Sequence, residues 1–350
     1  MDGLQIKANA KLPWIKWIMK SDENMRNKAS QQERDDSANL QKLCDSFARE
    51  TKLEFSKGQG VGELTTFGVG GKADLLVYAR AANELARAVT FVQKNQIPFF
   101  VLGGGSNTLV SDKRLVGAVI VARESKAHLG DLSIVGETAE TLNLQCDATV
   151  SNSRLLKFCI ERGLSQADYF AGIPGVVGGS IFGNAGTKYG SFSQIISGLE
   201  MIDTKNEIQL LGAKDIAFSY RKCQLPTAGI ILKGFFQFTK VKDGTWKDQL
   251  KQRMTERAKS QPIHQATAGC TFKNGADFQA GKLIEELGLK GLRVGGAQVS
   301  ETHANFIVNL GGATFSDIKE LIQKIKSLAK EKRAIDLTEE IRIVESLEGL

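Results

Sequence analysis

Two glycine-rich segments constrain the fold of this chain most strongly. The first is VLGGGSNTLV, residues 101–110, and the second is GIPGVVGGSIFGNAGTKYG, residues 172–190, with seven glycines in nineteen positions. Glycine adopts backbone conformations closed to other residues and allows another group to approach the backbone closely. Either segment alone could be a tight turn or a crossover between sheet layers. The two together favour a binding site for a large, flat, phosphorylated ligand.

The first segment suits a phosphate. Three glycines after an apolar strand can turn several N–H groups toward one anion, and Ser106 and Asn107 add side-chain hydrogen bonds. The segment does not match the P-loop pattern, and neither does GVGGKAD, in which Ala follows Lys72. No helix follows a GxGxxG directly, so a nicotinamide-type Rossmann site is disfavoured.

Hydrophobic periodicity predicts a mixture of strands and helices. The pattern at 81–96 places Leu85, Ala88, Val89 and Val92 on one helix face. Residues 314–334 form a second amphipathic helix with Thr314 or Ser316 as N-cap and Ile318, Leu321, Ile322, Ile325 and Leu328 as its apolar stripe. Further helices are expected at 40–49, from 152, at 243–261 and from 281. Strands are expected within 64–79, 97–102, 117–122, 230–241, 297–312 and 337–346, with a hairpin over 198–223 that turns at Lys205-Asn206.

Charge and cysteine usage limit the functional classes. The chain of 350 residues has a formal net charge of +7, but its basic residues are spread out, which favours anionic metabolites over nucleic acid. Five cysteines without a CxxC pair indicate a reducing compartment and no disulfide framework. With only three histidines, we expect no metal site.

The first fifty residues are polar and charge-mixed. No apolar run reaches the roughly 18 residues of a membrane span. The segment KLPWIKWIMK, residues 11–20, is too short and too charged for a secretory signal. It could be a surface-seeking amphipathic piece, but a docked or disordered extension is the favoured reading.

Several residues could take part in catalysis, and each also has a simpler structural interpretation. Cys270, in TAGCTFKN, could be a small core side chain, a stray thiol or an acid. Arg221, in FSYRKC, is expected at the end of a strand, where it could hold a carboxylate or an enolate, although a surface arginine is commoner. In TEEIRI, strand alternation puts Glu339 on the apolar face and Glu340 with Arg342.

The order of the motifs resembles one family closely. Residues 55–345 are similar to the UDP-N-acetylenolpyruvoylglucosamine reductases, flavoenzymes of peptidoglycan precursor synthesis. The resemblance is carried by eight blocks in order: TTFGVGGKAD, VLGGGSNTLV, GIPGVVGGSIFGNAG, FSYR, AGCTFKN, AGKLIEELGLKG, GGAQVSETHANFIVN and LTEEIRI.

The resemblance implies an α+β fold in three parts. Residues 1–51 would be a partly disordered extension. Residues 52–240 would form a two-part FAD-binding unit of the vanillyl-alcohol-oxidase (PCMH) type. Residues 241–350 would form an α+β substrate-binding domain, whose last strand returns toward the active site.

The resemblance also implies the reaction. Hydride would pass from NADPH through non-covalent FAD to the enolpyruvyl methylene of UDP-N-acetylglucosamine enolpyruvate. Arg221 and Glu340 would stabilise the resulting enolate. Cys270 stands where the family usually has a serine, and would donate the proton.

The resemblance implies two further sets of residues. The FAD contacts would be Gly103, Gly104, Gly105, Ser106, Asn107, Thr108, Pro174, Gly175, Gly178, Gly179, Ser180, Asn184, Ala185 and Gly186. The substrate contacts would be Tyr220, Lys259, Lys273, Asn274, Gln298, Ser300, His303 and Asn305.

The sequence departs from the family pattern in three places. Gly275 replaces a proline after Asn274. Ser260 replaces a common lysine, so Lys259, Lys273 or another base would hold the substrate diphosphate. The short run from Arg221 to Cys270 is typical of the shorter subclass.

Two other functions fit parts of the sequence. One is an FAD oxidase of the same superfamily, although residues 101–112 lack the histidine that often tethers FAD in such enzymes. The other is a catalytically silent nucleotide-binding protein, against which Arg221, Cys270 and Glu340 argue. We expect a cytoplasmic monomer that binds neither nucleic acid nor membrane.

Overall fold

The computed structural model describes residues 38–347 except 242 and 244. Contacts between Cα atoms divide the chain into two compact units, Met1–Glu50 and Thr51–Leu350. In the first unit, residues 38–50 are helical, which confirms the short helix expected at 40–49. The expectations for residues 1–37, including KLPWIKWIMK, lie outside the described residues.

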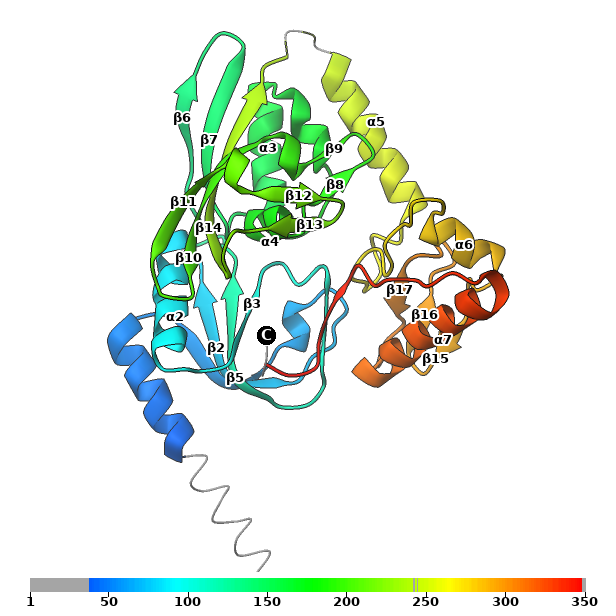
Figure 1. The fold of residues 1–350 in the computed structure, drawn as a ribbon, viewed down its shortest axis with the longest axis horizontal. Coiled ribbons are helices and arrows are strands. Elements are labelled where there is room, and N and C mark those ends of the chain that lie inside the picture. Colours follow the sequence, from blue (N-terminus) through cyan, green and yellow to red (C-terminus); the bar gives the residue numbers. More distant parts are fainter. Residues whose placement is uncertain (1–37, 242, 244, 348–350) are drawn as a thin grey trace, which may run out of the picture. The chain divides into compact units, whose positions relative to one another are not determined.

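The second unit begins with a four-stranded sheet of order β1-β2-β5-β3 (Figure 1). Its strands are β1 (Phe55–Gly60), β2 (Lys72–Ala79), β5 (Leu115–Ala122) and β3 (Phe99–Leu102). The β2–β5 and β3–β5 pairs are parallel. A parallel strand is covered on both faces, which explains why β5 is a nearly unbroken apolar run. The helix α2 (Ala82–Lys94) packs on β2 and β5 with the predicted apolar face buried.

A second, antiparallel sheet has the order β11-β10-β14-β7-β6. It comprises β11 (Ile208–Gly212), β10 (Ile196–Asp203), β14 (Gly229–Thr239), β7 (Thr141–Asp147) and β6 (Leu132–Glu137). The predicted turn is confirmed: Asn206 has φ 66°, and Asp203 accepts hydrogen bonds from the N–H groups of Lys205 and Glu207. The helices α3 (Asn152–Arg162) and α4 (Val177–Phe182) follow β7 in the chain, and α4 contacts β14.

The C-terminal part surrounds one apolar cluster. It contains α5 (Thr245–Ser260), α6 (Ala280–Glu286), α7 (Phe315–Arg333) and the sheet β15 (Arg293–Val294), β16 (Ala297–Val299) and β17 (Ile307–Asn309). Thr314 caps α7 through the N–H of Asp317, as predicted. The stripe of α7 is buried, and Leu328 packs against it half-buried.

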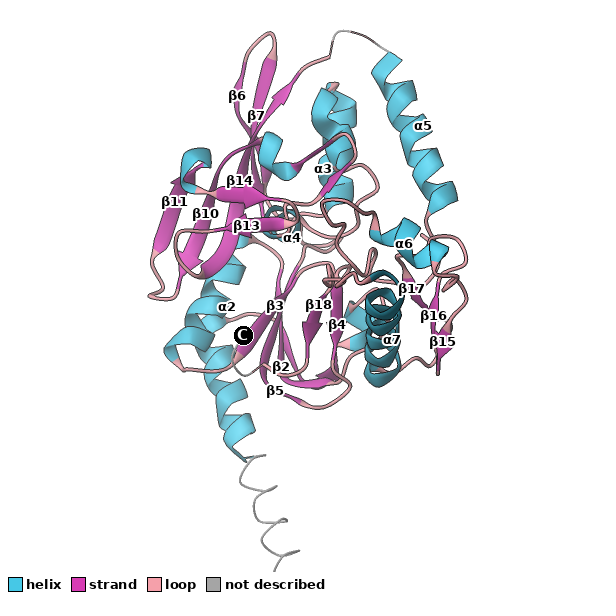
Figure 2. Ribbon diagram, turned by 45° about the vertical axis from the view of Figure 1, so that its right-hand side comes forward, coloured by secondary structure: helices cyan, strands magenta, loops and turns pink. Residues whose placement is uncertain are grey.

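The last strand returns to the first half of the chain. The strand β18 (Arg342–Val344) pairs in parallel with β4 (Thr108–Val110), directly after the first glycine loop (Figure 2). The remaining short strands are β8 (Gly186–Thr187), β9 (Gly190–Ser191), β12 (Ala217–Ser219) and β13 (Lys222–Gln224). The 3-10 helices are η1 (Gly62–Leu64), η2 (Ser165–Tyr169), η3 (Phe192–Gln194) and η4 (Ala213–Asp215). The fold is α+β, as expected.

Two expectations about strands were wrong. Residues 64–67 form the end of η1 and a turn instead of a strand, because Thr65 Oγ1 donates to the carbonyl oxygens of Gly62 and Val69. The single strand expected within 297–312 is a pair, β16 and β17, because residues 300–306 form the connection between them. Within the described residues, no helix combines the length and apolarity needed to cross a membrane.

Candidate active site

The first glycine loop leaves β3 with unused hydrogen-bond donors. Within the described residues, the N–H groups of Gly104, Gly105, Ser106 and Asn107 donate to no other group of the protein. Buried or ligand-facing N–H groups normally find an acceptor, and successive free ones form an anion-binding concavity. The loop therefore fits the phosphate of a bound cofactor.

The glycines of this loop are required by contacts within the protein. A Cβ on Gly104 would lie 2.4 Å from the Cα of Gly175, and one on Gly105, which has φ +64°, would lie 2.2 Å from the carbonyl oxygen of Leu64. The sequence predicts that the glycines of this loop let the backbone bend tightly and present N–H groups to an anion. At Gly104 and Gly105 the close approach of another backbone segment is a further requirement.

The second glycine segment lies against the first. Ser106 Oγ donates to the carbonyl oxygen of Pro174 over 3.2 Å, and Gly175 has φ +113°. Ser180 and Asn184, both expected to contact a cofactor, use their side chains within the protein. Ser180 bonds to Asn152, and Asn184 donates to the carbonyl oxygen of Ser219 over 2.9 Å. Cofactor contacts in this segment remain predictions.

Arg221 lies in a tight turn, not at the end of a strand as expected. It follows Tyr220 between β12 (Ala217–Ser219) and β13 (Lys222–Gln224), with φ +55°. Such a conformation is strained for a residue with a side chain and is found mainly where surrounding structure enforces it, often at functional sites. The guanidinium carbon lies 5.2 Å from the centroid of the Tyr220 ring.

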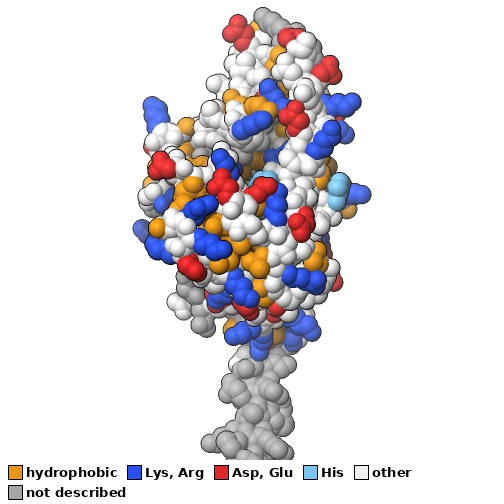
Figure 3. All heavy atoms as spheres, turned by 90° about the vertical axis from the view of Figure 1, so that its right-hand side faces the viewer, with side chains coloured by type: hydrophobic (Ala, Val, Ile, Leu, Met, Phe, Trp, Pro, Cys, Tyr) orange, Lys and Arg blue, Asp and Glu red, His pale blue; other side chains and the backbone are white. Residues whose placement is uncertain are grey.

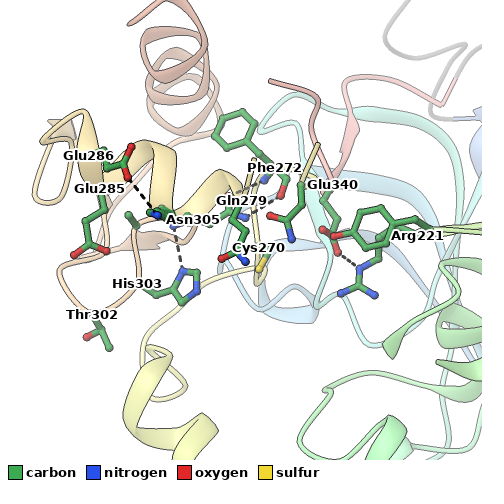
Figure 4. Close-up of a pocket in the computed structure, with 15 residues that line it drawn as sticks. Arg221, Cys270, Phe272, Gln279, Glu285, Glu286, Thr302, His303, Asn305 and Glu340 are labelled. Carbon is green, nitrogen blue, oxygen red and sulfur yellow. Dashed lines mark hydrogen bonds and ion pairs between the residues drawn. The ribbon is translucent and has the colours of Figure 1, made fainter. Parts of the chain in front are cut away.

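Glu340 meets Arg221 across the site (Figure 4). Arg221 Nε donates to Glu340 Oε1 over 2.6 Å. Burial raises the pKa of Glu340, and the Arg221 charge opposes this. The strand alternation predicted for Glu339 and Glu340 is wrong, because both residues precede β18. Glu339 instead forms an ion pair with Lys326 at 2.7 Å.

Cys270 lies beside this ion pair. It forms an isolated antiparallel bridge with Phe306 and lines the same pocket as Arg221 and Glu340. Burial, and then the Glu340 charge, raise the pKa of the thiol to about 11. The thiol is therefore protonated at neutral pH, as a proton donor must be. In contrast, Cys146, Cys159 and Cys223 are buried away from this pocket.

One cavity of about 570 Å³ contains these groups. Of the predicted site residues, seven line it: Tyr220, Arg221, Cys270, Asn274, His303, Asn305 and Glu340. Sequence reasoning did not identify the other eight: Phe272, Gln279, Gly281, Lys282, Glu285, Glu286, Thr302 and Ala304. The spacing of residues 282, 285 and 286 places them on one face of α6, which was the available signal.

Four predicted substrate residues do not line the cavity: Lys259, Lys273, Gln298 and Ser300. Gln298 donates to the carbonyl oxygen of Gly291, and Ser300 Oγ accepts from the N–H of Thr302. The Ser300 bond lies within the β16–β17 connection, whereas the Gln298 bond joins β16 to the segment that precedes β15. Lys273 is close enough for its charge to lower the pKa of Glu340.

His303 offers a hydrogen-bond donor to the cavity. Its Nδ1 accepts the N–H of Asn305 over 3.2 Å, so the neutral ring carries its proton on Nε2. Burial lowers the pKa of His303, which keeps the ring neutral at pH 7. Asn274, by contrast, uses its carbonyl oxygen to accept the N–H of Ala280 at the start of α6.

Arg257 on α5 does not line the cavity but lies near Cys270, and it was not identified from the sequence. Its Nη1 donates to the carbonyl oxygen of Ala171 and its Nε to Gln261. Its charge lowers the pKa of Cys270, so it lies within electrostatic reach of the thiol.

The face that carries α5, α6 and α7 mixes acidic and basic side chains without a single-sign patch (Figure 3).

Comparisons with known proteins cover most of the chain. Residues 73–212 match the profile of the FAD binding domain, and residues 261–344 match that of the C-terminal domain of UDP-N-acetylenolpyruvoylglucosamine reductase. The reductase of Syntrophobacter fumaroxidans is 37% identical over 83% of this chain and 84% of its own length. That of Moorella thermoacetica is 34% identical over 83% of this chain and 94% of its own length.

A solved structure agrees with these sequence matches. The reductase from Thermus caldophilus superimposes with a TM-score of 0.66 at 33% identity. The superposition covers 83% of this chain and 98% of that structure.

Proposed function

This chain belongs to the UDP-N-acetylenolpyruvoylglucosamine reductase family, and we propose that it reduces UDP-N-acetylglucosamine enolpyruvate to UDP-N-acetylmuramate for peptidoglycan synthesis. FAD would be the bound cofactor and NADPH the electron donor. The observation that carries the proposal is the meeting of Arg221, Cys270 and Glu340 in one cavity. They come from segments up to 119 residues apart in sequence.

The domain assignment follows the two profile matches. We assign residues 52–240 to the FAD-binding unit and residues 241–350 to the substrate domain, with residues 1–51 as an extension. The match over 73–212 supports the first assignment and that over 261–344 the second.

The two glycine segments would hold FAD. The free N–H groups of residues 104–107 suit its pyrophosphate, and residues 174–186 would contribute backbone contacts. When bound, FAD would carry hydride from NADPH to the methylene carbon of the enolpyruvyl group.

The residues of the cavity would then stabilise the negative charge that develops on the substrate. Hydride addition moves the electron pair of the C=C bond into an enolate conjugated with the substrate carboxylate. Within the described residues, the terminal nitrogens of Arg221 donate to no other protein group, so they are available to this enolate. Glu340 fixes the guanidinium through Nε, which orients those nitrogens before the charge develops.

Cys270 would complete the addition. Its thiol gives a proton to the carbon that bears the carboxylate, and the S–H bond breaks to leave a thiolate. Arg221 and Arg257, whose charges both lower the pKa of this thiol, stabilise that thiolate until solvent returns the proton. A thiol has a lower reference pKa than an alcohol, so cysteine can replace the usual serine in this role.

The α6 side of the cavity would bind the rest of the substrate. His303 Nε2–H and Asn274 offer donors, Tyr220 an aromatic face, and Lys282 with nearby Lys273 positive charge for the diphosphate. Lys259, Gln298 and Ser300 would need to move to take part. A nucleotide sugar and NADPH are cytoplasmic metabolites, and on that ground we place the enzyme in the cytoplasm; the monomeric state stays a prediction.

The flavin spectrum of the purified protein tests this function. We expect flavin absorbance that NADPH bleaches and that UDP-N-acetylglucosamine enolpyruvate restores without oxygen. A flavin that only oxygen reoxidises would instead indicate the oxidase alternative. A protein that cannot be reconstituted with FAD would refute the proposal.

A further inference from the structure

Asn305 is a lining residue of the cavity whose side chain is committed to the protein backbone. It lies between β16 and β17 and is only 4% exposed. Its Oδ1 accepts the N–H of Phe272 over 2.9 Å, and its Nδ2 donates to the carbonyl oxygen of the same residue over 2.8 Å. The amide thus pairs with Phe272 as a neighbouring strand would (Figure 4).

The backbone of Asn305 extends this pairing. Its carbonyl oxygen accepts the N–H of Thr271 over 2.7 Å. On the opposite side, the carbonyl oxygen of Thr271 accepts the N–H of Glu340 over 2.8 Å. The segment that begins at Cys270 is therefore held between Asn305 and Glu340, and Asn305 is the only one of the two that contributes side-chain bonds to it.

The amide of Asn305 has little capacity left for a substrate. One amide hydrogen and the oxygen are used by Phe272, and the buried amide lies close enough to Cys270 to lower the pKa of its thiol. A substituent on the substrate would have to break bonds between buried groups to bind here, which is costly. This differs from His303, whose Nε2–H donates to no backbone group in the described part of the chain.

We propose that Asn305 is a positioning residue, whose amide fixes the 270–272 backbone so that the Cys270 thiol faces the Arg221–Glu340 pair, and that it does not bind the substrate. This inference rests on the proposed role of Cys270 as proton donor. The family resemblance instead implies a substrate contact for Asn305.

A double-mutant cycle between Asn305→Ala and Cys270→Ala tests it. The readout is anaerobic reoxidation of the NADPH-reduced flavin by the enolpyruvyl substrate. Asn305→Ala should slow this step about 10- to 100-fold, with substrate KM changed less than about 3-fold, because only proton donation is impaired. In the Cys270→Ala background, Asn305→Ala should not lower the reoxidation rate further, because Asn305 acts through residue 270. A KM increase that persists in that background would show direct substrate binding and overturn the proposal.

Reaction of Cys270 with iodoacetamide separates this proposal from the proposed function. If Cys270→Ala reoxidises at full rate, the proton-donor role fails. The positioning role of Asn305 is then tested by alkylation alone. Asn305→Ala should change the rate of Cys270 alkylation at least about 5-fold, and an unchanged rate overturns the positioning role. Asn305→Asp, which keeps the oxygen and loses the donor, replaces Asn305→Ala if that variant does not fold.

Asn309→Ala is the matched control. Its amide likewise bonds to the backbone, at Phe67, Gly311 and Ala313, but not to residues 270–272. It should leave both the reoxidation rate and Cys270 alkylation unchanged. Equal effects from both asparagines would indicate loss of stability alone and contradict the proposal.

Discussion

Arg221 and Glu340 form a 2.6 Å ion pair between the β12–β13 turn and the chain leading into β18. The same glutamate donates its N–H to Thr271, next to Cys270, and accepts the side chain of Asn107 at its carbonyl oxygen over 3.2 Å. Glu340 is therefore bonded to three parts of the site: Arg221, the segment next to Cys270 and the first glycine loop. Because β18 returns to β4, the loop that would hold the cofactor phosphate is part of the same framework as the proton donor.

Arg221→Lys should impair the reaction although it keeps the charge. Lysine has no Nε–H equivalent that can hold Glu340 while other nitrogens face the enolate. We expect kcat to fall about 10²- to 10³-fold, as when a donor to a developing oxyanion is removed. Reduction of the flavin by NADPH should be unaffected.

Lys222→Ala is the control for Arg221→Lys. Lys222 is exposed and adjacent in the chain, at the start of β13. It should retain normal kcat. If Arg221→Lys also retains normal kcat, the guanidinium is not required for the enolate.

The reactivity of Cys270 should depend steeply on pH. Only the thiolate is alkylated, and burial with the Glu340 charge raises the pKa of this thiol to about 11. The iodoacetamide rate should therefore rise about tenfold per pH unit up to about pH 11. Mass spectrometry of the labelled peptide measures this rate, and a plateau near pH 9 would contradict the assigned environment.

Glu340→Gln should shift that pH profile downward. The carboxylate disfavours a neighbouring thiolate, so its removal lowers the pKa of Cys270, and Arg221 and Arg257 lower it further. At a fixed pH of 8, Cys270 should be alkylated faster in this variant than in the wild type. A slower reaction would mean that Glu340 does not face the thiol.

Gly105→Ala should weaken both folding and FAD binding, and Gly58→Ala is its matched control. Both glycines have φ near +64°, but a Cβ on Gly58 meets nothing within 4 Å, whereas one on Gly105 lies 2.2 Å from Leu64 O. The left-handed conformation alone costs about 1 kcal/mol. Urea unfolding should show only that loss of folding stability for Gly58→Ala, which should keep a normal flavin content. Gly105→Ala should lose more stability and should also have a low flavin content. Equal behaviour of the two variants would show that the loop contact is unimportant.

Sequence reasoning succeeded where local patterns determine structure. The stripe and N-cap of α7, the face of α2 and the turn at Asn206 depend on periodicity or on residues with specific turn preferences. The glycine segments and the motif order gave the family and seven residues of the cavity.

The failures have physical reasons. The β6–β7 hairpin was not predicted, because β6 is half-exposed and polar residues interrupt its alternation. Arg221 in a left-handed turn has no local signal, since that conformation is enforced by surrounding structure rather than by glycine or asparagine. The directions of Glu340 and Asn305 depend on pairing with residues 271–272, which are distant in sequence.

The most direct measurement is a single-turnover comparison of wild type, Cys270→Ser and Cys270→Ala. Each enzyme is reduced with one equivalent of NADPH without oxygen and mixed with UDP-N-acetylglucosamine enolpyruvate, and flavin reoxidation is followed. The account predicts that Cys270→Ser stays within about tenfold of wild type and that Cys270→Ala slows about 10²- to 10⁴-fold, the range of general acid catalysis. An undiminished rate in Cys270→Ala would contradict it.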